Sequence, residues 1–205
     1  MIPLPTNMNK LIFATNNENK VAEIKSIIGD LFNVVSLKDS GIEKDIPEPH
    51  ETLEENASEK SWTIYNLTGE NCFSEDTGLE TEALNGEPGV KSARYAGEGR
   101  SFTDNIQKLL TLLNGVENRK ARFRTVISLI IDGQEHLFSG SCEGHIGLEP
   151  KGEKGFGYDP VFIPVGDTRT FAEMSLEDKN IYSHRKKATA QLLSFLSQYG
   201  KKMYQ

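Results

Sequence analysis

The apolar residues of this chain fall into two patterns, short continuous runs and stripes at helical spacing. Residues 10–15 form a compact apolar run that gives way to Asn16 and Asn17, and apolar residues then recur at helical spacing up to Ile28. These patterns are typical of a buried strand followed by an amphipathic helix. The next predicted elements are a strand over residues 34–37, a helix over residues 53–67 and a short strand over residues 72–74. This order of strands and helices predicts an α/β fold.

A long β-rich run dominates the second half of the chain. It covers residues 123–131, and Asp132-Gly133 then links it to residues 134–140 as a two-residue hairpin. A helix is predicted before this run, with its apolar stripe over residues 106–113, an N-cap at Ser101 or Thr103 and an end at Asn114-Gly115. After the hairpin we expect a strand over residues 161–163, a capping box at Ser175 and Asp178, and a final helix over residues 183–198.

Length and composition are sufficient for a folded core. The chain has 205 residues, of which 37% are hydrophobic, and no second folded domain is required. The net charge of -7 argues against a nucleic-acid partner, because a polyanion is repelled by an acidic surface. Cys72 and Cys142 are far apart in sequence and form no Cys-x-x-Cys pair, so we expect both to be small buried side chains.

Two observations bear on localisation. Residues 1–7 lack the basic segment and the long apolar segment of a signal peptide. The chain also contains no apolar run of membrane-spanning length. We therefore expect a cytoplasmic protein without a membrane partner.

An acidic pair near the centre of the chain is the first candidate for chemistry. Glu75 and Asp76 follow the short apolar strand and precede Gly78, where we expect the backbone to turn. This pattern places the carboxylates at a sheet edge facing a crevice, where a hard metal ion such as Mg²⁺ binds. The alternative is an Asx-type turn whose Asp caps its own backbone.

The loop after the first strand is a candidate phosphate site. It consists of Thr15, Asn16, Asn17, Glu18, Asn19 and Lys20. Because it opens a helix, its hydroxyl, its free amide donors and its lysine are available to surround a phosphate at the positive end of the helix dipole. The Walker A pattern is absent. The alternative is an Asn-capped helix with a solvated lysine.

A glycine-rich aromatic loop is a candidate base site. Phe156 and Tyr158 flank Gly157, and Asp159 precedes a proline. Such a loop can stack a flat base on its aromatic faces, and the alternative is that both rings pack into the core. Further along, His184 and Arg185 open a helix and Lys179 precedes them. Arginine is well suited to donate to a carbonyl oxygen or a phosphate, although a surface position is its usual outcome.

Taken together, these segments resemble the inosine triphosphate pyrophosphatase family, also called Ham1-like. The resemblance runs from about residue 10 to residue 195, and the number and order of the motifs make it specific. The motifs are Thr15-x-Asn17-x-x-Lys20-x-x-Glu23, Glu55-Asn56-Ala57, Glu75-Asp76-Thr77-Gly78-Leu79, Pro88-Gly89-x-x-Ser92-Ala93-Arg94-Tyr95, Gly155-Phe156-Gly157-Tyr158-Asp159-Pro160 and Ser183-His184-Arg185. Two departures are mild, since Glu75 stands where the family commonly has Asp, and Thr77 replaces Ser.

The resemblance implies a fold and an assignment of residues. The fold is α/β, with a long mixed β-sheet and flanking helices, in which a single domain over residues 1–205 forms two lobes around a central nucleotide-binding cleft. Asp76 is implied to be catalytic and metal-binding, with Glu48 as the second metal-associated carboxylate. The implied substrate-binding residues are Thr15, Asn16, Asn17, Glu18, Asn19, Lys20 and Lys60 for the triphosphate, Thr77, then Phe156, Gly157, Tyr158 and Asp159 for base and sugar, and Lys179, His184 and Arg185 for the purine edge.

The resemblance also implies an activity, a cofactor and an assembly. The activity is hydrolysis of ITP, dITP and XTP between the α and β phosphates, with Mg²⁺ as cofactor, which clears these nucleotides from the pool. The assembly is a homodimer. Two alternatives stay open, a Maf-like pyrophosphatase acting on modified pyrimidine nucleotides and a non-catalytic nucleotide sensor. The aromatic loop and Ser183-His184-Arg185 favour the purine enzyme.

Preference for a deaminated base has a physical basis in this interpretation. A donor such as Arg185 or Lys179 satisfies O6 of inosine but meets an amino group in adenine, and the unpaired buried groups cost about 1 to 3 kcal/mol. Guanine shares that O6, so its rejection requires a mismatch at the 2-amino group. The sequence does not identify the residue responsible for that mismatch.

Overall fold

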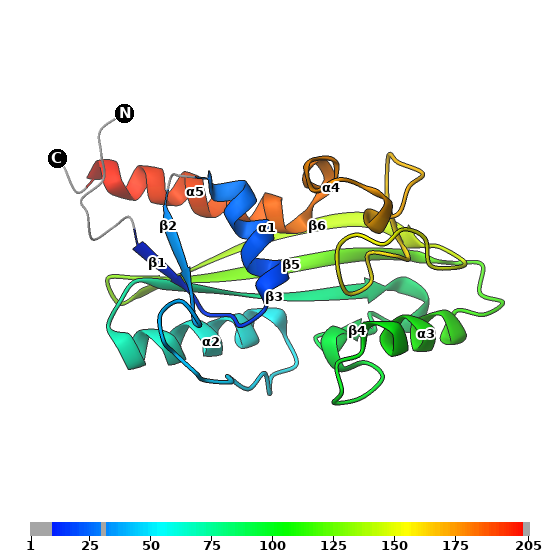
Figure 1. Cartoon of the computed structure of the whole chain (residues 1–205), viewed down its shortest axis with the longest axis horizontal. Helices are drawn as coiled ribbons and strands as arrows, with labels where there is room; N and C mark the ends of the chain where they lie inside the picture. Colours follow the sequence, from blue (N-terminus) through cyan, green and yellow to red (C-terminus); the bar gives the residue numbers. More distant parts are fainter. Residues whose placement is uncertain (1–9, 30–31, 203–205) are drawn as a thin grey trace. The chain divides into compact units, whose positions relative to one another are not determined.

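The computed structural model describes residues 10–29 and 32–202, and it divides the chain into two compact units. The first unit comprises the residues up to 76, residues 126–139 and the residues from 185 onward, and the second comprises residues 77–125 and 140–184. The elements, in chain order, are β1 Lys10–Phe13, α1 Glu18–Ile28, β2 Asn33–Ser36, α2 Leu53–Thr68, β3 Cys72–Thr81, β4 Pro88–Gly89, α3 Phe102–Leu112, β5 Lys120–Ile131, β6 Gln134–Ile146, β7 Phe162–Pro164, α4 Leu176–Tyr182 and α5 His184–Lys202, with short 3-10 turns at Glu82–Leu84, Ser92–Arg94 and Phe171–Glu173 (Figure 1).

The strands form a mixed sheet, which confirms the α/β class. Over the described residues the sheet has seven strands, in the order β2-β1-β3-β5-β6-β7, with β4 paired to β3. β1 pairs in parallel with both β2 and β3, whereas β3 pairs with β4, and β6 with β7, in antiparallel fashion. β3, β5 and β6 each contribute residues to both units.

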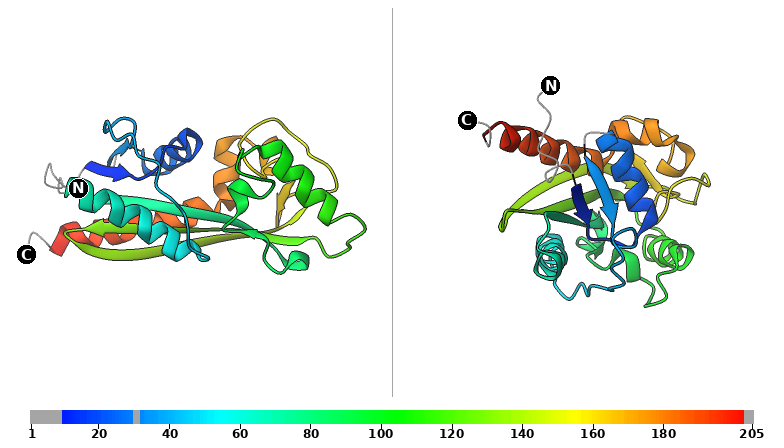
Figure 2. Two further views of the ribbon diagram at one scale, coloured as in Figure 1. Left: turned by 90° about the horizontal axis from the view of Figure 1, so that it is seen from below. Right: turned by 60° about the vertical axis from the view of Figure 1, so that its left-hand side comes forward.

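Alternation along the strands builds the core of the first unit. Successive strand side chains point to opposite faces of a sheet. Leu11 and Phe13 of β1 therefore pack with α1 and α5, while Ile12 packs with α2 on the other face. Phe13 stacks on Phe73 of β3, with ring centroids 4.5 Å apart. In this unit the sheet has α1 and α5 on one face and α2 on the other (Figure 1, Figure 2).

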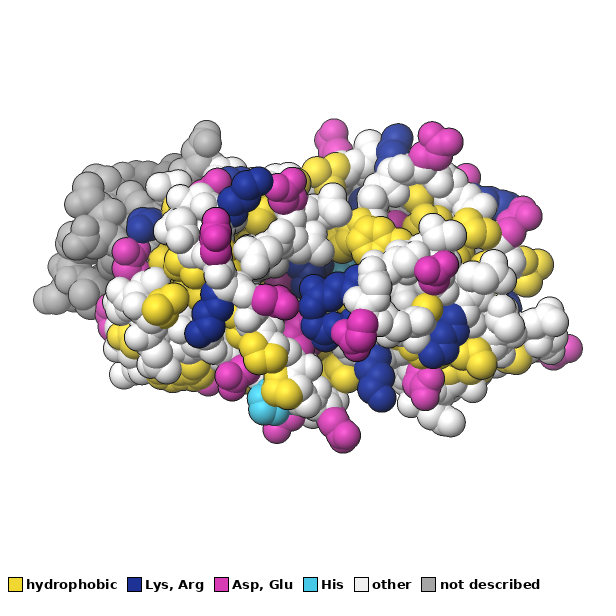
Figure 3. Space-filling view, turned by 60° about the horizontal axis from the view of Figure 1, so that its bottom comes forward, with side chains coloured by type: hydrophobic (Ala, Val, Ile, Leu, Met, Phe, Trp, Pro, Cys, Tyr) yellow, Lys and Arg dark blue, Asp and Glu magenta, His cyan; other side chains and the backbone are white. Residues whose placement is uncertain are grey.

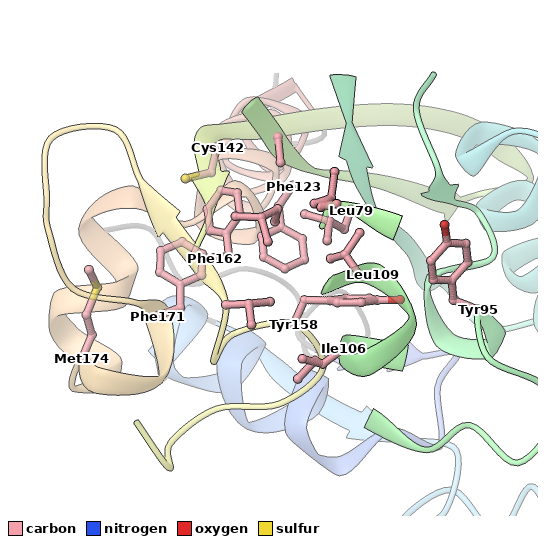
Figure 4. Close-up of a cluster of buried hydrophobic side chains, with 14 residues drawn as sticks. Leu79, Tyr95, Ile106, Leu109, Phe123, Cys142, Tyr158, Phe162, Phe171 and Met174 are labelled. Atoms are coloured by element: carbon pink, nitrogen blue, oxygen red, sulfur yellow. The ribbon is translucent and has the colours of Figure 1, made fainter. Parts of the chain in front are cut away.

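The second unit has its own aromatic core, shown in Figure 4. Phe162 packs against Phe123 and Phe171, with ring centroids 4.7 Å and 5.0 Å away. Leu109 of α3 and Tyr158 of the glycine-rich loop belong to the same cluster. Burial of these rings fixes the loop and the helix against the strands of this unit.

The prediction that β3 ends in a turn at Gly78 is wrong. β3 continues to Thr81, so Glu75 and Asp76 lie within a strand, and the Asx-turn alternative is wrong as well. Gly78 is needed there because a Cβ at this position would lie 2.7 Å from the carbonyl oxygen of Gly89, on the paired strand β4. The glycine marks a close approach of two backbones inside the sheet.

Several local predictions are confirmed. Asp132 and Gly133 both have positive φ, at 49° and 75°, as the two-residue hairpin between β5 and β6 requires. Ser101 caps α3 by accepting from the Asp104 backbone. Of the predicted capping box at Ser175 and Asp178, the structure shows the half in which the Ser175 hydroxyl accepts from the Asp178 backbone and caps α4. The sequence did not indicate the capping box that precedes α4, formed by Thr170 and Glu173.

The remaining expectations concern cysteines, surface and membrane. Cys72 and Cys142 are free and buried, as predicted. Acidic and basic side chains are interspersed with apolar ones on the face shown in Figure 3. None of the described helices combines the length and the apolar character needed to cross a bilayer. Residues 1–7, considered above for a signal peptide, lie outside the described residues.

Candidate functional site

Strand β3 directs two consecutive carboxylates to opposite faces of the sheet in the first unit. Phe73 and Glu75 face α1 and α5, whereas Ser74 and Asp76 face α2. The Ser74 hydroxyl donates to the carbonyl of Ala57 on α2 at 2.5 Å, which fixes this face of the strand. The alternation of a strand therefore places the acidic pair in two different charge clusters.

The first cluster centres on Glu75, which is 2% exposed. Arg185 at the start of α5 donates to both of its carboxylate oxygens, through Nε and Nη2, at 2.8 Å each. Lys20 of α1 forms an ion pair with Glu75 at 3.2 Å. Glu23, one turn further along α1, binds Nη1 of Arg185. Two cations and two carboxylates thus meet in the core of the first unit.

The electrostatics of this cluster keep Glu75 and Arg185 charged. Burial by itself would raise the pKa of Glu75, but the positive charges of Arg185 and Lys20 outweigh burial and lower the pKa to about 2. Burial would lower the pKa of Arg185, and the carboxylates of Glu75 and Glu23 raise it instead. Near neutral pH, Glu75 is therefore an ionised carboxylate inside the protein.

The second cluster centres on Lys60 of α2, which is 7% exposed. Its ammonium lies 2.6 Å from Oε1 of Glu48 and 3.5 Å from Oδ1 of Asp76. Burial would lower the pKa of Lys60, but the charges of Asp76 and Glu48 raise it. Asn56 anchors the loop that carries Glu48, because its side chain accepts from the backbone N–H of His50 and donates to the carbonyl of His50.

Glu48 and Asp76 together suit a single hard cation whose coordination shell is completed by ligands from outside the protein. In the described part of the chain, three or more His, Cys, Asp or Glu side chains nowhere gather as a metal site. Mg²⁺, however, is commonly held by one or two carboxylates, with substrate phosphates and waters supplying the remaining ligands. Because both carboxylates approach the same ammonium, this pair fits such a site.

The loop from Thr15 to Lys20 leads into the N-terminus of α1. Asn17 is the N-cap, and its side chain accepts from the backbone of Asn19 and Lys20 at 3.0 Å and 3.2 Å. Thr15 accepts from the backbone of Asn17, and Asn16 donates to the carbonyl of Lys44. The capped helix is therefore present. The side chain of Lys20 is 16% exposed, so it is neither solvated at the surface nor fully enclosed.

In the second unit, Asp159 organises the glycine-rich loop. Its carboxylate accepts from the backbone of Phe156 at 2.9 Å and from Lys179 of α4 at 2.6 Å. A Cβ at position 155 would lie 2.1 Å from the Asp159 carboxylate, and Gly155 has φ +74°, so glycine is required there. The Lys179 ammonium also lies 5.3 Å from the ring centroids of Phe156 and Phe171.

The other candidates of the second unit differ in exposure. Tyr158 is buried in the aromatic core, and its hydroxyl donates to the carbonyl of Ser92 at 3.0 Å, so this ring packs as the alternative interpretation proposed. Phe156 is half-buried. His184 is buried and stacks on Phe123, with ring centroids 4.7 Å apart. The Thr77 hydroxyl pairs with that of Thr125 at 2.6 Å.

The candidate residues thus fall into two groups, each described within its own unit. The first unit brings together Lys20, Lys60, Glu48, Asp76 and Arg185, and it adds Glu75 and Glu23, which are not among the site residues that the resemblance implies. Glu75 was detectable in principle, since a charged residue within an apolar strand is buried and needs a partner. The second unit brings together Phe156, Asp159 and Lys179.

Comparison with known proteins agrees with the resemblance seen in the sequence. The model of the Ham1 family matches residues 11–195. The chain is 52% identical over 190 residues to a dITP/XTP pyrophosphatase of Porphyromonas gingivalis, covering 92% of this chain and 98% of that protein. It is 50% identical over 186 residues to the dITP/XTP pyrophosphatase of Flavobacterium psychrophilum, with 91% and 98% coverage.

Solved structures agree as well. The Ham1 protein of Staphylococcus aureus superposes with a TM-score of 0.84 at 39% identity, covering 93% of this chain and 99% of that chain. The family model thus matches nearly all of the described residues, and these relatives are about half identical over nearly their whole length. The chain belongs to the Ham1 family.

Proposed function

We propose that this protein hydrolyses the deaminated purine nucleoside triphosphates ITP, dITP and XTP to the nucleoside monophosphate and pyrophosphate. Relatives that are about half identical over nearly their whole length are named dITP/XTP pyrophosphatases. The observation that carries the proposal is the Lys60 ammonium, which is held by Glu48 and Asp76 in the core of the first unit. A buried cation between two carboxylates is a suitable partner for a metal-bound polyphosphate.

In this proposal the triphosphate binds to the first unit. Lys20 and Lys60 offset its negative charge, and each is held by a carboxylate of β3. The loop from Thr15 to Lys20 adds the N-terminal amides of α1, where the helix dipole favours an anion. Thr77 is proposed to contact the substrate through its hydroxyl.

Mg²⁺ is proposed as the cofactor, with Glu48 and Asp76 as its protein ligands. When bound, the metal offsets the charge that develops on the phosphate oxygens during transfer. Asp76 is proposed as the residue that orients the attacking water and accepts its proton, a role that typically contributes roughly 10²- to 10⁴-fold in rate. Its place on β3 beside Lys60 supports this assignment.

The base is proposed to bind to the second unit. Phe156 is half-buried and offers a ring face, and the contact between Asp159 and its backbone fixes the loop. Lys179 and His184 are proposed to donate to the edge of the base, where a donor satisfies O6 of hypoxanthine and rejects the amino group of adenine. Arg185 also stays proposed as a reader of the purine edge, and its guanidinium contacts Glu75 and Glu23.

The assembly and the cellular context are part of the same proposal. Four statements stay predictions: the chain forms one domain of two lobes, it assembles as a homodimer, it is cytoplasmic, and it has no nucleic-acid partner. Light scattering coupled to size-exclusion chromatography measures the assembly directly. A mass equal to one chain of 22.8 kDa would contradict the homodimer.

The test is a panel of nucleotides incubated with purified protein and Mg²⁺, with pyrophosphate as the readout. We expect ITP, dITP and XTP to be cleaved much faster than ATP, GTP or dTTP. Preference for dTTP would favour the Maf-like alternative, and tight nucleotide binding without turnover would favour the sensor. Equal rates on all nucleotides would contradict the proposed recognition of the base.

A further inference from the structure

We infer that Asn56 is a positioning residue for Glu48, one of the two carboxylates proposed to hold the metal. The inference rests on the proposed function, because Glu48 is a metal ligand only within that proposal. It uses contacts of the first unit alone, to which all residues up to 76 belong. It gives a part to the Glu55-Asn56-Ala57 motif, to which the proposed function assigns none.

The two carboxylates of the proposed metal site have very different supports. Asp76 lies within β3, whose backbone is held by neighbouring strands of the sheet. Glu48 lies in residues 42–49, which contain no helix, strand or turn. Mg²⁺ requires a nearly octahedral shell of oxygens at about 2.0 to 2.1 Å. A carboxylate on an irregular stretch of chain meets this requirement only if another part of the protein holds that stretch in place.

Asn56 supplies this support through the main chain of His50. It lies at the start of α2 and is 1% exposed. Its Oδ1 accepts from the backbone N–H of His50 at 3.0 Å, and its Nδ2 donates to the carbonyl of His50 at 3.1 Å. One side-chain amide therefore pairs with both main-chain groups of a single residue. Alanine at this position can make neither contact.

The chain between His50 and Glu48 is short and stiff. Pro49 alone separates the two residues, and Pro47 precedes Glu48. A proline fixes its own φ and restricts the residue before it to extended conformations. At the other end, Ile46 is buried in the core cluster that includes Ile64 of α2. The position of His50 therefore determines where the backbone of Glu48 lies.

Glu48 reaches the proposed metal site from this segment. Its Oε1 lies 2.6 Å from the Lys60 ammonium, which lies 3.5 Å from Oδ1 of Asp76. The Glu48 side chain is 23% exposed, so burial alone does not fix it. Without Asn56 the segment gains conformations in which Glu48 points away from Asp76. Groups that hold metal ligands in place typically contribute roughly 10- to 100-fold in metal affinity.

The alternative is that Asn56 only stabilises the start of α2. Its replacement would then lower the free energy of unfolding and leave the metal affinity unchanged. The two assignments also differ in their dependence on Glu48. If Asn56 acts through Glu48, its replacement has no further effect on metal affinity once the Glu48 carboxylate has been removed.

The experiment is a double-mutant cycle of Asn56→Ala and Glu48→Gln. Electron paramagnetic resonance measures the affinity for Mn²⁺ in the absence of nucleotide, since Mn²⁺ prefers the same oxygen ligands as Mg²⁺. We expect Asn56→Ala to weaken Mn²⁺ binding by about tenfold when Glu48 is present. In the Glu48→Gln background, we expect the same replacement to change the affinity by less than about twofold. The Mg²⁺ concentration for half-maximal cleavage of ITP should rise in Asn56→Ala as well.

Two control variants separate this effect from a loss of stability. His50→Ala should leave the Mn²⁺ affinity unchanged, because the two contacts with Asn56 are made by the main chain of His50. Ser61→Ala removes a buried hydroxyl of α2 that is hydrogen-bonded to Ser128, so it should lower the free energy of unfolding without changing the Mn²⁺ affinity. Should Asn56→Ala fail to fold, Asn56→Ser replaces it in the cycle with the same expected results.

Wild-type Mn²⁺ affinity in the Asn56 variant, or an equal loss with and without the Glu48 carboxylate, would overturn the inference. A loss in His50→Ala or Ser61→Ala as large as that in the Asn56 variant would overturn it too. Each of these results leaves the proposed function standing if wild-type protein releases pyrophosphate from ITP. Wild-type protein without pyrophosphate release refutes the proposed function itself, whereas the Mn²⁺ measurement requires no turnover.

Discussion

Replacement of Glu75 by glutamine should destabilise the fold far more than loss of an ordinary surface charge. The Glu75 side chain is fully buried. Its carboxylate accepts two hydrogen bonds from Arg185 and forms an ion pair with Lys20. Glutamine keeps the shape but removes the charge. Arg185 then remains buried with Glu23 as its described carboxylate partner.

The expected loss can be worked out in two ways. Removal of one partner of a buried ion pair costs about 3 to 5 kcal/mol, and the remaining contact with Glu23 favours the lower end of this range. The pKa of Glu75 falls from its ordinary value of 4.5 to about 2, which corresponds to roughly 3 kcal/mol of preference for the ionised form. For a chain of this length, such a loss lowers the melting temperature by roughly 6 to 12 °C.

The assay is thermal unfolding followed by circular dichroism, together with urea unfolding at neutral pH. Glu80→Gln is the matched control, because Glu80 pairs with Arg122 at 2.6 Å while the Arg122 side chain is 48% exposed. Exposed pairs are worth at most about 1 kcal/mol, so the control should lose little. Equal losses for Glu75→Gln and Glu80→Gln would refute the reasoning.

The pH dependence has a definite sign. Because the pKa of Glu75 is lower in the folded protein than in the unfolded chain, its contribution to the free energy of unfolding is fully present above pH 4.5. The contribution is lost as the pH falls from 4.5 through about 2. The difference in unfolding free energy between wild-type protein and Glu75→Gln should therefore shrink over this range. A difference that is constant from neutral pH to pH 2 would contradict the charge argument.

Three further variants probe the rest of the site. Asp76→Asn should abolish pyrophosphate release while melting within a few degrees of wild-type protein, and near-normal activity would refute its catalytic role. Lys60→Met should tighten the binding of Mn²⁺ in the absence of nucleotide by about tenfold or more, because it removes a cation that competes for Glu48 and Asp76. Electron paramagnetic resonance measures this affinity, and an unchanged value would contradict the proposed ligand pair. Gly78→Ala should cost about 1 to 3 kcal/mol in urea unfolding, because its Cβ would meet the backbone of Gly89 at 2.7 Å, and a neutral result would show that β4 moves away at no cost.

The sequence predicted correctly those local structures that depend only on neighbouring residues. The hairpin at Asp132-Gly133 followed from the two positive φ values that its turn requires. The wrong prediction of a turn at Gly78 has a physical cause. Gly78 lies within a strand, and a Cβ there would lie 2.7 Å from the backbone of Gly89 on the paired strand. Glycine at such a close backbone approach is indistinguishable from a turn glycine in sequence, because the sequence does not show which backbone lies beside it.

The candidate site was foreseen by resemblance more than by local pattern. Nothing near Lys60 in the sequence indicates that it pairs with Glu48 and Asp76, because these contacts depend on which face of β3 each side chain takes. The same alternation sends Glu75 to Arg185, which lies 110 residues further along the chain. Such pairings become visible only when the packing of helices on the sheet is known.

The central claim, cleavage between the α and β phosphates, is tested most directly by identifying the products formed from ITP. Purified protein is incubated with ITP and Mg²⁺, and the nucleotide and phosphate products are quantified by anion-exchange chromatography. We expect IMP and pyrophosphate in equal amounts, and neither product above background with Asp76→Asn. Formation of IDP and orthophosphate, or IMP release that Asp76→Asn leaves intact, would contradict the account.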